Sequence, residues 1–223
     1  MGKICNALLI LIIGLICYGC GNKNHDIPKK KNVEARAYNR KCSVFSNIPQ
    51  VDANKKEIIF LGHSLVNEFL VDEYMPHGDS IVYTNMGIGG DDTRGVYYRR
   101  DLAFNRNPNL IVMELGINDI INVEPMDSIT YYYGALLDAA HQQNINVIVC
   151  ATMPQQKQNE RQIVLLNDYL KRKAKELSYR YIDLFTPMEV GGALSPKYDC
   201  GDNTHLTGLG YKVWADSLKQ YLW

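Results

Sequence analysis

The sequence lacks an excess of charge of either sign, since 24 lysine and arginine residues balance 24 aspartate and glutamate residues over 223 positions. A protein that binds nucleic acid through its phosphates needs a basic surface, so this balance argues against a polyanionic partner. The one run of like charge, Lys29-Lys30-Lys31, is more typical of a solvated tether than of a binding patch. We therefore predict no nucleic-acid partner.

Motifs for nucleotide and metal cofactors are also missing. Neither the dinucleotide fingerprint GxGxxG nor the phosphate loop GxxxxGK[ST] occurs in the chain. No pattern of cysteine and histidine suggests a zinc site. We therefore expect neither a cofactor nor a metal ion.

The chain also lacks an apolar run long enough to span a bilayer comfortably. The run over residues 7–16 follows the basic start Met1-Gly2-Lys3, and together they have the layout of a secretory signal. The segment ends in Gly19 and Cys20, and a polar stretch follows at once. This end resembles a bacterial lipobox, although Cys17 stands where a leucine is usual. The resemblance implies cleavage before Cys20 and acylation of its thiol.

The predicted organisation is a signal peptide over residues 1–19, a lipid-anchored tether over 20–50 and one domain over 51–223. Acyl chains on Cys20 would hold an exported protein on a membrane. We therefore expect a lipoprotein of the cell envelope, anchored on the periplasmic or surface side. A membrane-spanning anchor helix is the alternative for this segment. About 170 residues remain for the domain, enough to bury one core.

Cysteine is scarce beyond the leader, where Cys42, Cys150 and Cys200 remain. An odd number of cysteines in an exported protein permits at most one bridge and leaves a free thiol. Cys150 ends an apolar run and is expected to be buried. Because Cys42 and Cys200 both lie in loop-like sequence, they are the favoured pair.

Apolar, strand-like runs alternate with amphipathic segments along the domain. The predicted strands cover residues 58–61, 81–84, 110–115, 146–150 and 181–184. Apolar residues three and four apart predict three helices, with the sets Ile129, Tyr132, Leu136 and Ala140, then Ile163, Leu166, Leu170, Ala174 and Leu177, then Tyr211, Trp214, Leu218 and Leu222. This alternation predicts a parallel sheet covered by helices on both faces. We expect short connections, with no segment long enough for a lid.

Four stretches at the ends of these elements carry either polar, reactive side chains or several glycines: Gly62-His63-Ser64, the glycine-rich loop 87–90, Gly116-Ile117-Asn118-Asp119, and Asp202-Asn203-Thr204-His205. The first three follow strands, at the edge where open parallel sheets bind their ligands. The fourth precedes the last helix and places a carboxylate within reach of an imidazole. Each stretch alone has an ordinary structural explanation as a helix cap, a turn or a structural contact.

Taken in this order, the four stretches resemble the SGNH hydrolases, also called the GDSL esterase and lipase family. The resemblance covers nearly all of the chain from residue 58 onward. It implies an α/β fold: a three-layer α/β/α sandwich with a central five-stranded parallel sheet, the flavodoxin-like SGNH hydrolase fold.

The same resemblance implies roles for individual residues. Ser64 is implied as the nucleophile, His205 as the general base and then acid, and Asp202 as its orienting partner. The implied oxyanion hole combines the backbone N–H groups of Ser64 and Gly90 with the side-chain amide of Asn118. These residue types suit the chemistry, because a serine hydroxyl needs a base and a tetrahedral intermediate needs preorganised donors.

One position departs from the family's pattern, because His63 stands where the family usually has aspartate. That aspartate is not the triad acid, so the implied mechanism is unaffected, but the hydrogen bonding around the oxyanion loop is in question. His63 is also an alternative base. Neighbouring residues at a strand end point to opposite sides, which favours His205.

The resemblance implies a serine esterase. Because no segment remains for a lid, we expect a shallow, open cleft that buries few methylenes, and therefore a short-chain acyl esterase with acetyl esters of carbohydrates favoured. Polar residues that flank the loops, Asp92, Thr93 and Asn203, suit a hydroxylated leaving group. The alternatives within the family are a lysophospholipase and a thioesterase.

Three other classes are less consistent with the residues. The α/β-hydrolase elbow is GxSxG, but Val66 occupies the place of its second glycine. A metal-dependent phosphoesterase built on Asp202 and His205 would need further ligands that the sequence does not cluster. A non-catalytic, glycan-binding lipoprotein would have no need of all the reactive residues together.

Overall fold

The computed structural model describes residues 33–222. The predicted signal peptide, the lipidation site Cys20 and the first part of the tether lie outside the described residues. Within residues 33–222, none of the helices combines the length and the apolar character needed to cross a membrane.

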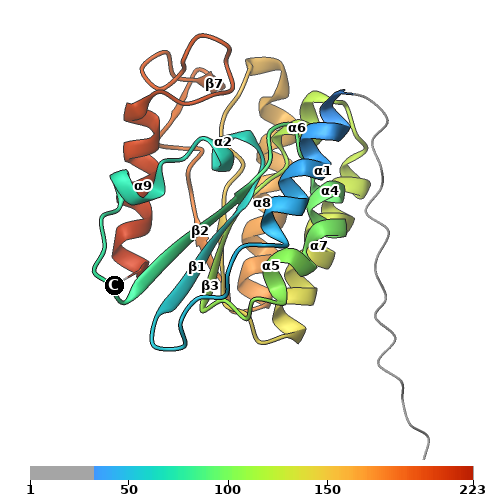
Figure 1. Ribbon diagram of the computed structural model, residues 1–223. Coiled ribbons are helices and arrows are strands. Elements are labelled where there is room, and N and C mark those ends of the chain that lie inside the picture. Colours follow the sequence, from blue (N-terminus) through green and yellow to red (C-terminus); the bar gives the residue numbers. More distant parts are fainter. Residues whose placement is uncertain (1–32, 223) are drawn as a thin grey trace, which may run out of the picture.

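A five-stranded sheet forms the centre of the domain (Figure 1). Its strands run parallel in the order β2-β1-β3-β4-β5, with bounds β1 (Lys56–Gly62), β2 (Ile81–Gly87), β3 (Leu110–Glu114), β4 (Val147–Cys150) and β5 (Arg180–Ile182). This is the strand order of flavodoxin-like sheets. The predicted fold class is confirmed, and a strand occurs at each of the five predicted positions.

Helices cover both faces of the sheet (Figure 1). One face carries α1 (Val33–Phe45), α4 (Thr93–Arg99), α5 (Asp101–Phe104), α6 (Ile117–Ile121), α7 (Met126–Gln142) and α8 (Glu160–Glu176). The other carries α2 (Ser64–Asn67), α3 (Val71–Tyr74) and α9 (Gly208–Leu222). A single 3₁₀ turn, η1 (Lys157–Asn159), precedes α8. The three helices predicted from apolar spacing are α7, α8 and α9.

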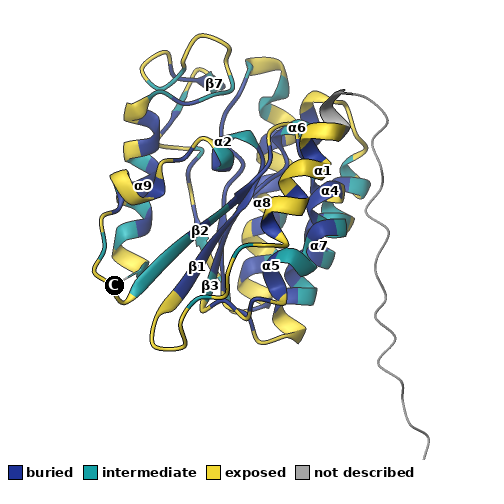
Figure 2. Cartoon of the chain, viewed as in Figure 1, coloured by how far each residue is buried: buried dark blue, intermediate teal, exposed yellow. Residues whose placement is uncertain are grey.

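Two hydrophobic cores lie on opposite sides of the sheet because side chains alternate along a strand. In β1, Ile59 and Leu61 belong to the first core, whereas Ile58 and Phe60 belong to the second. Figure 2 shows the burial that results along the central strands and the inward helix faces. The sheet is therefore a rigid base for the loops at its carboxyl edge.

Helix α1 corrects the boundary predicted for the tether. Its residues Tyr38, Cys42 and Phe45 are buried in the first core, and the Tyr38 hydroxyl donates to the Gly95 carbonyl at 3.1 Å. These three residues share one helix face, since they are four and three positions apart. The stripe is short and set among lysine, arginine and asparagine, so no apolar period stood out in the sequence.

The cysteine prediction is wrong in one respect. Cys42, Cys150 and Cys200 are all free thiols. Cys42 is buried in α1 and Cys200 is exposed in the loop before α9, so the favoured bridge does not form. The expected burial of Cys150 is confirmed.

One connection is much longer than predicted. Residues 183–207 join β5 to α9. Their regular structure is a short antiparallel hairpin, β6 (Glu189–Val190) and β7 (Ala193–Leu194), and an isolated antiparallel bridge between Asp199 and Leu206. This segment lies above the carboxyl edge of the sheet, at the top of Figure 1. Its later part carries two of the predicted site residues, so the expectation of short connections throughout is wrong here.

Candidate active site

Ser64 lies at the junction of β1 and α2. A side chain at Gly62 would place its Cβ 2.4 Å from both the Glu114 carbonyl and the Val66 side chain, so only glycine fits the end of this strand. Ser64 is the first residue of α2, and its N–H therefore has no acceptor within that helix. The strand end and the helix start together hold the serine at the sheet's carboxyl edge.

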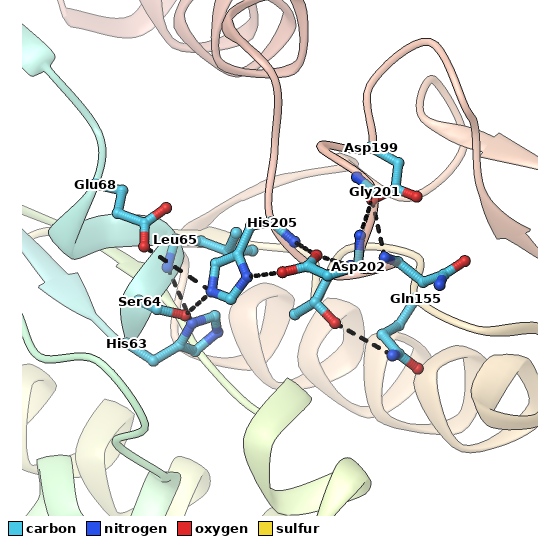
Figure 3. A network of polar contacts seen from close by, with 11 residues as sticks. His63, Ser64, Leu65, Glu68, Gln155, Asp199, Gly201, Asp202 and His205 are labelled. Atoms are coloured by element: carbon cyan, nitrogen blue, oxygen red, sulfur yellow. Dashed lines mark hydrogen bonds and ion pairs between the residues drawn. The ribbon is translucent and has the colours of Figure 1, made fainter. Parts of the chain in front are cut away.

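The structure brings Ser64, His205 and Asp202 into one line of contacts (Figure 3). His205 Nε2 lies 2.9 Å from Ser64 Oγ, and His205 Nδ1 lies 2.6 Å from Asp202 Oδ2. The imidazole can therefore accept the hydroxyl proton while its other nitrogen donates to the carboxylate. The side chains of His205 and Asp202 are 30% and 50% exposed, so the site opens to solvent.

The Asp202 carboxylate is held by its own loop. Its Oδ1 accepts the backbone N–H groups of Thr204 at 2.9 Å and His205 at 2.8 Å, which leaves Oδ2 for the imidazole. The hydrogen bond from the backbone N–H of His205 lowers the pKa of Asp202 the most, and the hydrogen bond with the imidazole adds to this effect, so that the pKa is about 2. The carboxylate is therefore ionised at neutral pH, as an orienting partner must be.

Two further residues, Asp199 and Gln155, hold this loop in shape (Figure 3). Asp199 Oδ1 accepts three consecutive backbone N–H groups, those of residues 201 to 203, at distances of 2.8 to 3.1 Å. Gln155, which is buried, donates from Nε2 to the Thr204 hydroxyl at 3.2 Å. The imidazole is thus positioned by a loop that forms hydrogen bonds within itself and with the segment after β4.

Gly90 and Asn118 flank Ser64, because β1 lies between β2 and β3 and all three strands end at the same edge. Gly90 has φ +72, a left-handed conformation that favours glycine, and its N–H has no hydrogen-bond partner among residues 33–222. Asn118 Nδ2 donates to the Asp91 carbonyl at 2.7 Å. A primary amide has two hydrogens, so one is left for a ligand.

A buried arginine fixes the glycine-rich loop against the strands. Arg99 donates to Asp91 Oδ2 at 2.7 Å, to the Met86 carbonyl at 2.9 Å and to the Gly62 carbonyl at 3.0 Å. Both charged side chains are fully buried. The ends of β1 and β2 and the loop that carries Gly90 are therefore linked through one guanidinium group.

Asp119, which follows Asn118 in α6, forms hydrogen bonds with the first residue of α4. Its carboxylate accepts the Thr93 hydroxyl at 2.6 Å and the Thr93 N–H at 3.1 Å. Burial raises the pKa of Asp119 to about 6. The role of Asp119 is therefore to hold the neighbouring loop.

His63 points into the interior and pairs with Glu114. His63 Nε2 lies 3.0 Å from Glu114 Oε2, and both side chains are fully buried. Burial alone would lower the pKa of His63, but the Glu114 carboxylate raises it above its ordinary value. His205, and not His63, contacts the Ser64 hydroxyl, so the alternative base lies on the far side of the strand end.

Two site residues had no role in the sequence reasoning. Glu114 is the last residue of β3, whose other residues are apolar, and a charged residue at the end of a buried run was the available signal. Glu68 Oε1 lies 4.0 Å from His205 Nε2. Glu68 could have been found from its position four residues after Ser64, because residues four apart lie on the same side of a helical turn.

A family model described as GDSL-like Lipase/Acylhydrolase family matches residues 61–213. No curated protein matches the chain. The chain is similar in fold to a GDSL-like lipase from Bacteroides thetaiotaomicron, with 23% identity, a TM-score of 0.73, and coverage of 82% of this chain and 95% of that chain.

Two acetylxylan esterases are also similar in structure. One has 19% identity and a TM-score of 0.66, and the match covers 75% of this chain and 100% of that chain. The other is a catalytic mutant of the enzyme from Geobacillus stearothermophilus, with 15% identity, a TM-score of 0.65, and coverage of 77% and 95%. Identities this low establish a shared fold and no more.

Proposed function

Because the chain belongs to the GDSL-like lipase/acylhydrolase family and is thus a carboxylic ester hydrolase, we propose that it removes short acyl groups, acetyl above all, from hydroxylated alcohols such as carbohydrates. The observation that carries the proposal is the continuous contact from Ser64 Oγ through His205 to Asp202, at 2.9 and 2.6 Å. In this proposal Ser64 is the nucleophile, His205 the base and Asp202 its partner.

The first half of the reaction forms an acyl-enzyme. Ser64 Oγ attacks the acyl carbon while His205 Nε2 takes the hydroxyl proton, and the carbonyl oxygen becomes an oxyanion. As the intermediate collapses, the bond from carbon to the alcohol oxygen breaks and Nε2 gives its proton to that oxygen. Asp202 stays ionised throughout and stabilises the imidazolium between these transfers.

The second half repeats the steps with water in place of the serine hydroxyl. His205 takes a proton from water, the new bond forms at the acyl carbon, and Ser64 leaves with the proton that Nε2 returns. The free acid and the starting enzyme result. In both halves the oxyanion needs donors already in place, which we assign to the N–H groups of Ser64 and Gly90 and to the Asn118 amide.

Replacing Asn118 by alanine should lower kcat by roughly a hundredfold or more and leave KM nearly unchanged, because the lost donor acts mainly on the transition state. Steady-state kinetics with p-nitrophenyl acetate measure the split. An intact urea-unfolding midpoint would show that losing the bond to the Asp91 carbonyl has not displaced the loop. A rise in KM with an unaltered kcat would mean that Asn118 only binds substrate.

The preference for short acyl groups is supported by the exposure of the site. The His205 and Asp202 side chains remain 30% and 50% exposed, so the triad lies at an open surface and not at the bottom of a deep channel that would bury a long acyl chain. Each methylene contributes about 0.8 kcal/mol only when it is buried. The two structural relatives named as acetylxylan esterases agree with an acetyl substrate.

A series of p-nitrophenyl esters from acetate to palmitate tests this preference. We expect kcat/KM to be highest for the shortest esters and to gain little from added methylenes, because an open site cannot bury them. A value that climbs steadily beyond octanoate would favour a lipase or a lysophospholipase, with segment 183–207 as the part of the chain able to cover an acyl group.

Anchoring at the cell envelope through a lipid on Cys20 stays a prediction from the sequence. Residues 1–32 lie outside the described part of the chain. If the anchor is present, the proposed enzyme acts on esters that reach the membrane surface.

A further inference from the structure

Glu68 places a carboxylate beside the catalytic imidazole, on the nitrogen that faces Ser64. Its Oε1 lies 4.0 Å from His205 Nε2, the same atom that lies 2.9 Å from Ser64 Oγ (Figure 3). The Glu68 backbone N–H also donates to the Ser64 carbonyl at 2.9 Å. The carboxylate is therefore carried by the nucleophile's own turn of helix.

This position faces the leaving alcohol. In the proposed mechanism His205 Nε2 delivers a proton to the departing oxygen, which must come within hydrogen-bond distance, about 3 Å, of that nitrogen. Groups attached to the neighbouring carbon of the alcohol then lie next to Glu68. A hydroxyl there could donate to the carboxylate, whereas a phosphate or carboxylate there would meet a like charge.

The charge of Glu68 is not neutralised by a basic side chain. Among residues 33–222, no lysine or arginine forms an ion pair with it, and its side chain is 49% exposed. The neighbouring loop adds the carboxylates of Asp199 and Asp202. Slight burial raises the pKa of the exposed Cys200 thiol in this loop, and the charges of Asp202, Asp199 and Glu68 raise it further. This side of the site is therefore negative.

We infer that Glu68 is a specificity-determining residue that favours esters of neutral, hydroxylated alcohols and disfavours esters of anionic ones. The inference rests on the proposed esterase function and deepens it by naming the class of leaving group. It separates acetylated neutral sugars from lysophospholipids, whose leaving alcohol carries a phosphodiester anion. Repulsion between unit charges about 6 Å apart in a half-exposed site corresponds to roughly a tenfold loss in kcat/KM.

Two acetyl esters that differ by one charge test this inference. In acetoxyacetate the leaving alcohol bears a carboxylate on the carbon that carries its hydroxyl, and in acetoxyacetamide a neutral amide takes that place. We would measure kcat/KM for both with the wild type and with Glu68→Gln, and express the result as the anionic-to-neutral ratio. Differences in intrinsic reactivity between the esters cancel when the two ratios are compared.

The ratio should rise about tenfold in Glu68→Gln at low ionic strength, and less at high salt, where exposed charges are screened. Glu176→Gln makes the same change of net charge at the last residue of α8, at the opposite edge of the sheet, and should leave the ratio unaltered. Equal changes for both esters in Glu68→Gln, or no change in the ratio, would overturn the inference. A folded wild type that hydrolyses neither ester would instead count against the proposed function.

Discussion

Replacing Ser64 by alanine should lower kcat for p-nitrophenyl acetate by about five to six orders of magnitude, the loss expected when a triad serine is removed. The reason is chemical: without Oγ the acyl group has no covalent carrier, and His205 can act only on water. The fold should persist, because among the described residues the hydroxyl contacts His205 Nε2 and contributes little packing.

The control for this experiment is Ser46→Ala, which removes an exposed hydroxyl just beyond α1 and should leave kcat unchanged. A serine-directed phosphonate should inactivate the wild type and fail to label Ser64→Ala, whereas a chelator should leave the wild type active. A Ser64→Ala protein with native circular dichroism and most of its activity would contradict the assignment. Loss of activity to the chelator would point to the metal-dependent alternative.

Much of the fold could be predicted because its signals are local. A buried parallel strand is a short apolar run, and five such runs separated by helical periods leave few topologies. The position of the site could be predicted from the same strands. The carboxyl ends of parallel strands lie at one edge of the sheet, so Ser64, Gly90 and Asn118 lie there together although they are far apart in sequence. The contact between Asp202 and His205 could be predicted from their spacing of three residues alone.

The parts that were missed depend on contacts between distant residues. Helix α1 packs through Tyr38, Cys42 and Phe45, too few apolar residues to give a clear period in a polar segment. Segment 183–207 has little regular structure, so no apolar period predicted how it would fold over the edge of the sheet. The contacts of Glu68 with His205, and of Glu114 with His63, join charges far apart in the chain, and only the fold brings them together.

The pair His63 and Glu114 gives a physical reason for the departure from the family's usual Gly-Asp-Ser. Gly62 pairs directly with Glu114 across β1 and β3, so the residue after Gly62 lies beside that carboxylate. Neither oxygen of Glu114 has a hydrogen-bond donor among the described residues, and the ion-pair contact with His63 is what offsets its burial. An aspartate at position 63 would face a second buried carboxylate.

The substitution His63→Asp should therefore lower the free energy of unfolding by about 3–5 kcal/mol at neutral pH, because it leaves a buried charge without its partner and adds a like charge. The double variant His63→Asp with Glu114→Gln should recover most of this loss, since one carboxylate is then replaced by an amide of similar shape. Urea unfolding of the wild type, both single variants and the double variant gives the coupling between the two positions.

The pH dependence distinguishes charge repulsion from poor packing in this experiment. Two buried carboxylates cannot both ionise easily, so in His63→Asp the pKa of one of them should be raised in the folded state. A folded state that holds a proton more tightly than the unfolded chain is stabilised as pH falls and loses that stability as pH rises through the raised pKa. The deficit of His63→Asp should thus be smaller at about pH 5 than at about pH 8. The double variant should show a smaller difference between the two pH values, because its one remaining carboxylate is buried beside an amide and not beside a like charge. A deficit that is independent of pH and survives in the double variant would mean that His63 fills space rather than matching the charge of Glu114.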